Sequence, residues 1–211
     1  AILWERRLYE GSSFGYGLTI DSSGYVYAAG RATDASRTYC LLAKYDSSGS
    51  IQWQKKTYEA TYTSIGWDVT VDSSNNIYLV GRANDGTRTH LALQKFDTTG
   101  SRAWTRKLYD GTTVGYGVST DSSGNVYVCG SSNADINGII AKYNSSGTIQ
   151  WQRKISYTSN GGVLQAVANS SSNNVFCVGQ FIDSTATYNI GVSIKIPSDG
   201  SAVSGYAFVN M

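Results

Sequence analysis

The sequence predicts an all-β fold: a β-propeller of four repeats of about 50 residues, each a four-stranded antiparallel blade. One observation is a phrase that opens on tryptophan and recurs at Trp4, Trp53, Trp104 and Trp151, with spacings of 49, 51 and 47 residues. Another is that Gly and Ser interrupt the chain roughly every ten residues, while helical spacing of apolar residues is nowhere sustained. A repeat of short strands with this period is typical of propeller blades.

The first two strands of each repeat form a predicted hairpin. In the third repeat, residues 115–121 and 125–130 have the pattern of strands, and the turn sequence from Asp121 to Gly124 separates them. Asp in such a turn accepts hydrogen bonds from the backbone ahead of it, and Gly supplies a positive φ. The turn recurs at residues 21–24, at residues 72–75 with Asn75 in the left-handed position, and more loosely around Asn169.

The rest of each repeat supplies two more strands. In the third repeat these are residues 139–143 and 148–155, joined by a second turn at residues 144–147. The second strands of all repeats, residues 26–29, 77–80, 126–129 and 175–178, are apolar on both faces. Strands of this kind are covered on both sides, which favours small sheets stacked around an axis over a two-layer sandwich. The glycines that follow them indicate a bulge or a close backbone approach; they are Gly30, Gly81, Gly130 and Gly179.

Two phrases of the third repeat resemble a known family. The sequence Asp-Ser-Ser-Gly-Asn-Val-Tyr-Val that begins at Asp121, and the sequence Ala-Lys-Tyr-Asn-Ser-Ser-Gly-Thr-Ile-Gln-Trp that ends at Trp151, are similar to the SBBP-type β-propeller repeat of bacterial and bacteriophage proteins. The resemblance covers nearly the whole chain. It implies a propeller fold and a surface, secreted or virion-associated setting, often within a longer polypeptide, and it carries no catalytic residues to transfer.

The predicted organisation is a single domain over residues 1–211, with blades at about 10–57, 58–108, 109–155 and 156–211. Residues 2–8 have the fourth-strand signature before any first strand, so we expect them to complete the last blade and close a four-bladed ring. Residues 202–209 would then be an extra strand or a tail. The alternative is an open arc that pairs with a second copy of the chain or with further blades.

Candidate binding residues lie in the first strands. Aromatic residues occupy one equivalent position as Tyr16, Trp67 and Tyr116, with Leu164 in the fourth repeat. Lining a central channel, they would form stacking platforms for a sugar or another flat ligand. The alternative is packing between blades, because Tyr16 shares strand parity with apolar neighbours.

Two departures from the repeat add polar candidates. Asp68 and Gln165 stand where the first and third repeats keep Gly17 and Gly117. A polar side chain there either reaches a ligand in the channel or hydrogen-bonds a neighbouring turn.

The loop between the second and third strands varies most, and variable loops on a rigid frame often carry recognition. Two of these loops hold paired arginines near an Asp, Arg31 with Arg37 and Arg82 with Arg88. Such pairs suit bidentate contact with carboxylate or phosphate groups. The alternative is a local, solvated ion pair such as Arg31 with Asp34.

Charge and composition exclude several classes of partner. The net charge is +2 with 15% charged residues, so no field favours nucleic acid, and no apolar stretch is long enough for membrane insertion. The three cysteines, Cys40, Cys129 and Cys177, lie in apolar runs and are expected to be buried and free. Basic pairs in the fourth strands are expected to guard exposed edges; they are at residues 6–7, 55–56, 106–107 and 153–154.

The sequence offers few candidates for catalytic residues. His90 is the only histidine and falls in a variable loop, and no nucleophile elbow, phosphate loop or metal-ligand spacing is present. We therefore expect no catalytic residue, cofactor or metal, and predict that the chain is not an enzyme. The predicted function is a binding or structural module, virion-associated or at a cell surface, that recognises a glycan or a protein. The alternatives are an architectural subunit of a phage particle and a glycoside hydrolase using Asp68, Asp34, Asp85 or Asp135.

Overall fold

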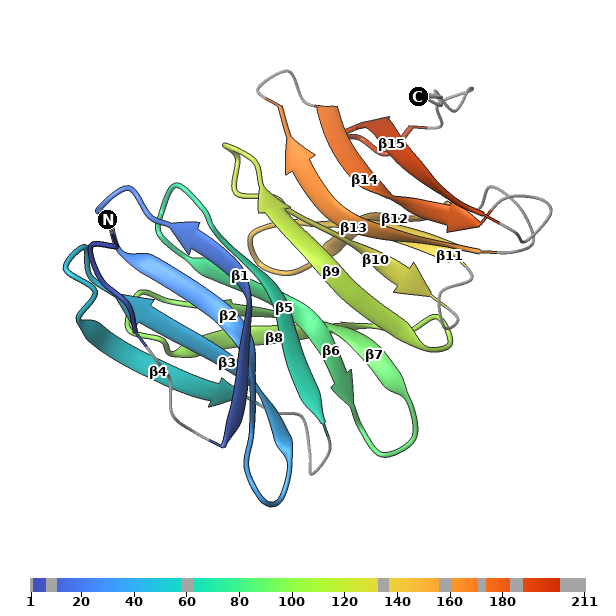
Figure 1. The fold of residues 1–211 in the computed structure, drawn as a ribbon. Helices are drawn as coiled ribbons and strands as arrows, with labels where there is room; N and C mark the ends of the chain where they lie inside the picture. Colours follow the sequence, from blue (N-terminus) through green and yellow to red (C-terminus); the bar gives the residue numbers. More distant parts are fainter. Residues whose placement is uncertain are drawn as a thin grey trace.

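The structure is a computed structural model that describes residues 2–6, 11–57, 63–132, 137–155, 161–170, 174–182 and 188–201. These residues form fifteen strands in four antiparallel sheets and contain no helix (Figure 1). Sheet 1 consists of β1 (Ser12–Ile20), β2 (Val26–Thr33), β3 (Thr38–Tyr45) and β4 (Ile51–Thr57). Sheet 2 consists of β5 (Ser64–Val71), β6 (Ile77–Asn84), β7 (Thr89–Phe96) and β8 (Arg102–Leu108).

Sheet 3 consists of β9 (Thr113–Thr120), β10 (Val126–Ser132), β11 (Asn137–Tyr143) and β12 (Ile149–Ile155). Sheet 4 consists of β13 (Gly162–Asn169), β14 (Asn174–Ile182) and β15 (Asn189–Pro197), so within the described residues it has three strands and not the predicted four. In every sheet, strands that follow one another in the chain are neighbours, as predicted. The described part of the chain has no helix long and apolar enough to cross a membrane.

The hairpin turns form as predicted. Gly24 and Gly124 have φ of 83° and 76°, and Asn75 has a φ of 62° in the equivalent position. The Asp that begins each turn accepts hydrogen bonds from the backbone ahead, and it also accepts one from the hydroxyl of a buried Tyr six residues later. The pairs are Tyr27 with Asp21, Tyr78 with Asp72 and Tyr127 with Asp121, with O···O distances of 2.9, 3.0 and 3.1 Å. Each turn is therefore tied to the core of its own sheet.

The sheets pack face to face in chain order. One apolar cluster joins sheets 1 and 2, a second joins sheets 2 and 3, and a third joins sheets 3 and 4. The first strands β1, β5, β9 and β13 pack next to one another in this order. Sheets 1 and 4 lie at opposite ends of the row, so the described residues form an open arc and not a closed ring (Figure 1).

Glycines allow the first and second strands of each sheet to approach closely. A Cβ on Gly81 would lie 1.9 Å from the carbonyl oxygen of Ile65, and one on Gly130 would lie 1.9 Å from that of Val114. Next to each such glycine, the register between the first and second strands shifts by one residue. The predicted bulge or close approach is therefore present in all four sheets.

The tryptophan that marks each repeat joins one sheet to the next. Trp104 lies against Gly147 in the second turn of sheet 3, and Trp151 lies against Gly200 in that of sheet 4. The arginine two residues later donates to the carbonyl of the same glycine, with Arg106 Nε 2.7 Å from Gly147 O. We call this contact the Trp–Arg clasp. The first residue of each basic pair in the fourth strands therefore adjoins the following sheet, in addition to any role in guarding an edge.

Within the described ranges, residues 2–6 do not pair with sheet 4 as the predicted closure requires. Trp4 packs on Tyr45 with a ring distance of 6.1 Å, and Arg6 Nε donates to Gly49 O at 2.6 Å, so both contact sheet 1. Among the described residues, β15 pairs only with β14. Residues 7 and 8 of the expected closing strand, and residues 202–209, lie outside the described residues.

Candidate functional site

The predicted aromatic residues lie at the register shifts of the first strands. Gly15 and Gly17 pair with Gly30 and Ala29, so Tyr16 between them is an extra residue that opposes no partner. Trp67 and Tyr116 stand at the same bulge in β5 and β9. A bulge re-aims the side chain it carries. Tyr16 is 40% exposed, and its strand neighbours Leu18 and Ile20 are exposed as well; its ring packs against Trp67 of sheet 2, so it takes part in packing between sheets and is also accessible.

The rings form one continuous row across three sheets. Tyr16 and Trp67 have their ring centres 4.4 Å apart, and Trp67 and Tyr116 have theirs 5.7 Å apart. Phe14, which the sequence analysis missed, extends the row at a ring distance of 6.4 Å from Tyr16. The equivalent residue in the next sheet is the aliphatic Ile65, so this departure from the repeat was the available signal. We call Phe14, Tyr16, Trp67 and Tyr116 the aromatic row.

Two nitrogen donors beside the row have no hydrogen-bond partner among the described residues. One is Nε1 of Trp67 and the other is Nε of Arg31, and both atoms are shielded from solvent. The guanidinium of Arg31 lies 4.4 Å from the centre of the Phe14 ring, its cross-strand neighbour. A buried donor without a partner is unfavourable by about 1–3 kcal/mol, so a ligand oxygen would stabilise each of them where the side chains that cover it move aside.

Asp68 follows Trp67 and is the one carboxylate in the first strands of the four sheets. Its side chain accepts hydrogen bonds from the backbone of Val69 at 2.8 Å and of Val118, in sheet 3, at 3.0 Å. Burial raises the pKa of Asp68, and these two hydrogen bonds partly offset that rise. Of the two roles predicted for this residue, the structure shows a hydrogen bond to the neighbouring sheet.

Gln165 belongs to the site at a different position from the predicted one. Leu164 pairs with Gly179 and Ala166 pairs with Val178, so Gln165 is the bulge residue of β13. It therefore corresponds to Tyr16, Trp67 and Tyr116, and Ala166 corresponds to Asp68. The predicted alignment of the fourth repeat was wrong by one residue. The exposed amide of Gln165 stands where the other sheets carry an aromatic ring.

The four predicted arginines do not come together. Arg31 and Arg82 lie within β2 and β6 and not in loops, while Arg37 and Arg88 lie in the loops beyond. The guanidinium groups of Arg37 and Arg88 lie over the rings of Tyr39 and Tyr109. Only Arg31 reaches the aromatic row.

Asp34 does not pair with Arg31 in the part of the chain that the structure describes. It accepts a hydrogen bond from the Tyr39 hydroxyl at 2.7 Å and others from the backbone of Ser36 and Arg37. The Tyr39 hydrogen bond, with the two from the backbone, lowers the pKa of Asp34. The expected local ion pair is therefore replaced by a capped loop.

Other candidates for chemistry are dispersed. His90 lies in β7 and not in a loop; it is buried, with Nδ1 3.9 Å from Asp85 and its ring against Tyr109. The cysteines are buried and free, as predicted. Asp135 lies outside the described residues. Within the described ranges, no three His, Cys, Asp or Glu side chains gather as metal ligands would.

The third repeat, which contains β9 to β12, includes the part of the chain that matches a known family. Residues 109–137 match the family model of the SBBP β-propeller repeat. The match confirms the resemblance that the sequence predicted, in the third repeat. No curated protein matches this chain.

Solved structures share the fold at low sequence identity. An endo-arabinase from Bacteroides thetaiotaomicron VPI-5482 has a TM-score of 0.52 and 13% identity, over 97% of this chain and 82% of the other. The α-L-arabinofuranosidase PaAbf62A from Podospora anserina, in complex with cellotriose, has a TM-score of 0.51 and 12% identity, over 94% and 68%. A eukaryotic initiation factor has a TM-score of 0.49 and 9% identity; the match covers 72% of this chain and 35%, about a third, of that protein.

These likenesses contradict the prediction that the chain is not an enzyme. That prediction relied on the absence of catalytic motifs, yet the fold is one that glycoside hydrolases use. Glycoside hydrolysis depends on carboxylates brought together in space, which no short motif records. At 12 to 13% identity the likeness establishes the fold alone, and the function of this chain is a separate question.

Proposed function

We propose that the chain binds a glycan along the aromatic row. The observation that carries this proposal is the unbroken run of rings from Phe14 to Tyr116, with neighbouring centres 6.4, 4.4 and 5.7 Å apart. Aromatic faces offer large, rigid apolar area at low entropic cost, which suits the apolar faces of sugar rings. Phe14 and Tyr16 are 46% and 40% exposed, so a ligand has access to this end of the row.

Polar groups beside the rings support recognition of hydroxyl groups. The exposed Gln165 amide both donates and accepts hydrogen bonds. Nε1 of Trp67 and Nε of Arg31 are donors without partners among the described residues, and they become available to a ligand when the side chains that shield them move. Binding sites commonly combine apolar surface with a few such polar groups that orient the ligand. The pattern fits a neutral, hydroxyl-rich ligand better than an anion, because Arg31 is the one predicted arginine beside the row.

The comparisons suggest where to look for the ligand. The structures that share the fold include an endo-arabinase and an α-L-arabinofuranosidase bound to cellotriose. Arabino-oligosaccharides and cello-oligosaccharides are therefore the first probes. The family resemblance favours a virion or cell-surface setting, in which a polymeric glycan would be the partner.

Calorimetry with these oligosaccharides tests the proposal. We expect saturable binding that Trp67→Ala weakens at least tenfold, which corresponds to about 1.4 kcal/mol. Trp67→Phe keeps a ring but removes the donor, so it should weaken binding less than the alanine variant does. Tyr188→Ala removes an exposed tyrosine outside the row and is the matched control.

Circular dichroism verifies that each variant is folded. Equal affinity of Trp67→Ala, Tyr188→Ala and the unchanged chain would contradict a site on the aromatic row. The absence of binding to any member of a broad glycan array would contradict glycan recognition, and would favour a protein partner or an architectural subunit of a phage particle.

Glycoside hydrolysis is a second candidate, favoured by the fold and by Asp68. A carboxyl group whose pKa is raised by burial is suited to act as a general acid, and Asp68 adjoins Trp67 in the row. Its hydrogen bonds to the backbone of Val69 and Val118 favour a structural role instead. Release of reducing sugar from arabinan, abolished in Asp68→Asn while binding persists, would establish hydrolysis.

A further inference from the structure

The two ends of the arc expose apolar side chains that the sheets between them bury. On the front face, which is the face of sheet 1 turned away from sheet 2, Leu18 is 64% exposed. Its equivalents Val69 and Val118 are 3% and 4% exposed, because each packs against the preceding sheet. Sheet 1 therefore presents the surface with which sheets 2 and 3 contact a preceding sheet.

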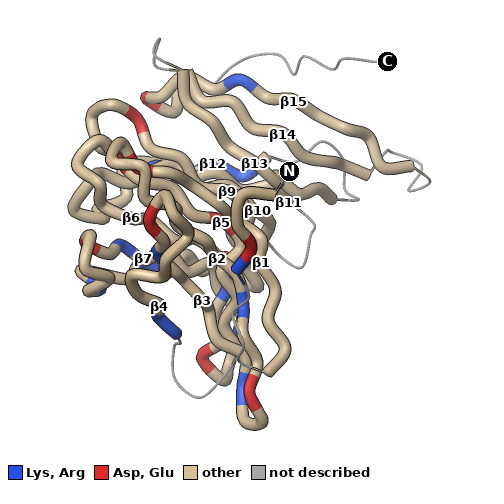
Figure 2. Tube along the Cα trace, turned by 60° about the vertical axis from the view of Figure 1, so that its left-hand side comes forward, with Lys and Arg blue, Asp and Glu red and all other residues tan. Residues whose placement is uncertain are grey.

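The back face, which is the face of sheet 4 turned away from sheet 3, shows the complementary pattern. Phe176 and Val178 are 42% and 47% exposed, whereas their equivalents Tyr127 and Cys129 are fully buried against sheet 4. Strands β13 and β14 carry no charged residue, as Figure 2 shows, and neither does β1. The charged residue beside Phe176 is Lys195, whose ammonium lies 6.0 Å from the Phe176 ring. Its equivalent Lys142 lies over Tyr127 and donates to Ser198 O of sheet 4 at 3.0 Å, so a lysine at this position is compatible with contact with a following sheet.

Residues 2–6 already occupy the place of a preceding sheet's fourth strand. Trp4 lies against Gly49 in sheet 1 just as Trp151 lies against Gly200 in sheet 4. Arg6 donates to Gly49 O at 2.6 Å, as Arg106 donates to Gly147 O. The Trp–Arg clasp is thus formed on sheet 1, although the described residues contain no sheet to which its strand belongs.

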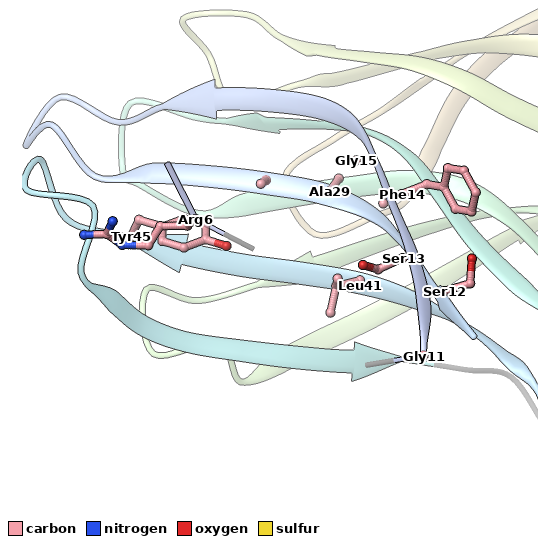
Figure 3. Close-up of a pocket in the computed structure, with 11 residues that line it drawn as sticks. Arg6, Gly11, Ser12, Ser13, Phe14, Gly15, Ala29, Leu41 and Tyr45 are labelled. Carbon is pink, nitrogen blue, oxygen red and sulfur yellow. The ribbon is translucent and has the colours of Figure 1, made fainter. Parts of the chain in front are cut away.

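A groove on the front face marks the position of that sheet. It has a volume of about 610 Å³ and runs along β1, β2 and β3 between Phe14 and Tyr45, with Arg6 at one end (Figure 3). A Cβ on Gly115 would meet Val80 of the preceding sheet at 2.5 Å, whereas one on the equivalent Gly15 would meet none of the described residues within 4 Å. The space above Gly15 is the space that a preceding sheet fills in sheet 3.

We infer that a second copy of this chain fills this space, with its back face on the front face of the first copy. The two copies join head to tail at both ends and form one ring of eight sheets. Residues 2–6 of each copy lie beside β15 of the other and supply the fourth strand of its sheet 4. Trp4 then packs on the partner's Phe176, as Trp151 packs on Tyr127 at 6.1 Å.

Two copies are the number that fits a propeller. Rings of this fold have 4 to 8 blades, so two chains of four sheets reach the upper limit and three chains exceed it. A head-to-tail interface closes into a ring when the rotation allows, and each copy then has no exposed end. The ring also extends the proposed binding site, because the partner's Gln165 comes next to Tyr16 just as Gln165 follows Tyr116.

Solution mass is the first test, by sedimentation or by light scattering on a sizing column. We expect the unchanged chain to have twice the monomer mass, and Leu18→Asp and Val178→Asp each to have the monomer mass with an unchanged circular dichroism spectrum. Ile149→Asp is the matched control, since Ile149 is a 44% exposed residue of β12 on neither face, and it should remain dimeric. A monomeric unchanged chain, or a ladder of longer oligomers, would overturn the two-copy ring.

A cross-link tests the strand pairing directly. In sheet 3, Ala141 of β11 pairs with Gln152 of β12, and the equivalent positions are Ile194 and Glu5. Because Cys177 pairs with Ile194 between β14 and β15, the test is made in a chain that carries Cys177→Ala. There the double variant Glu5→Cys and Ile194→Cys should form a disulfide that runs at dimer mass on a non-reducing gel, while either single variant should not. A disulfide at monomer mass would show closure within one chain, and no disulfide would show that another segment occupies the edge of β15; either result would overturn the pairing.

Discussion

Strands β10 and β14 have the same position in neighbouring sheets and closely similar sequences, yet they differ in burial. All seven residues of β10 are buried, whereas buried and exposed residues alternate along much of β14. Both strands were predicted to be covered on two faces, from the same apolar pattern. The difference lies in the neighbours: β10 stands between two sheets, and among the residues that the structure describes β14 has a sheet on one side only. Sequence pattern thus records the environment for which a strand is suited, and the number of sheets present decides whether that environment exists.

The largest expected loss of stability concerns the close approach of the first and second strands in a sheet that packs between two others. Gly81→Ala places a Cβ 1.9 Å from the carbonyl oxygen of Ile65, so the strands must separate. We expect a loss of at least about 3 kcal/mol of unfolding free energy, measured by urea denaturation. Gly191→Ala in β15 is the matched control, because its Cβ would meet nothing within 4 Å. Equal stability of the two variants would show that the close approach is not a constraint.

High pH should destabilise the covered sheets. Burial, together with the neighbouring aspartate, raises the pKa of Tyr27, Tyr78 and Tyr127 above the usual value of 10. As pH rises above 10, the unfolded chain loses these protons before the folded chain does, so the unfolding free energy falls by up to about 1.4 kcal/mol per pH unit for each phenol. Urea denaturation between pH 9 and 11.5 measures the slope. In Tyr78→Phe the slope should decrease by about one proton, and an unchanged slope would show that this phenol is not responsible.

A smaller loss of unfolding free energy is expected at neutral pH. It concerns the hydroxyl group of the three buried tyrosines, which the equivalent Phe176 in sheet 4 lacks. Tyr78→Phe removes the hydroxyl that donates to Asp72 at 3.0 Å and leaves the ring in place. The loss should be about 1–2 kcal/mol, because Asp72 keeps its backbone hydrogen bonds from Ser74 and Asn76. At Phe176 the reverse change, Phe176→Tyr, should leave stability within about 0.5 kcal/mol, since that side chain is 42% exposed. Thermal unfolding of the two variants measures the contrast.

Local features of the repeat could be predicted from sequence because they depend on nearby residues. The turn from Asp121 to Gly124 has its hydrogen bonds and positive φ, and the glycines after the second strands have their close approach. These are contacts within one hairpin. Turn chemistry and steric limits act over a few residues, so a single sequence reveals them.

The bulge shows where sequence reasoning failed. An extra residue in a strand has no cross-strand partner, and the sequence does not mark which residue it is, so Gln165 was assigned to the wrong position. The aromatic row was predicted as a set of equivalent residues, but Phe14 and Arg31 joined it only through cross-strand pairing. Contacts between residues on paired strands depend on the strand register, and the sequence repeat alone does not determine that register.

The Trp–Arg clasp has a consequence for how this architecture can grow. Each tryptophan, with the Arg or Lys two residues later, lies against the glycine turn of the sheet that follows it in the chain, and nothing in the contact depends on how many sheets precede it. Duplication or loss of a whole repeat during evolution would leave every remaining junction intact. Repeat number in such chains is therefore free to drift, while the junction itself must be kept.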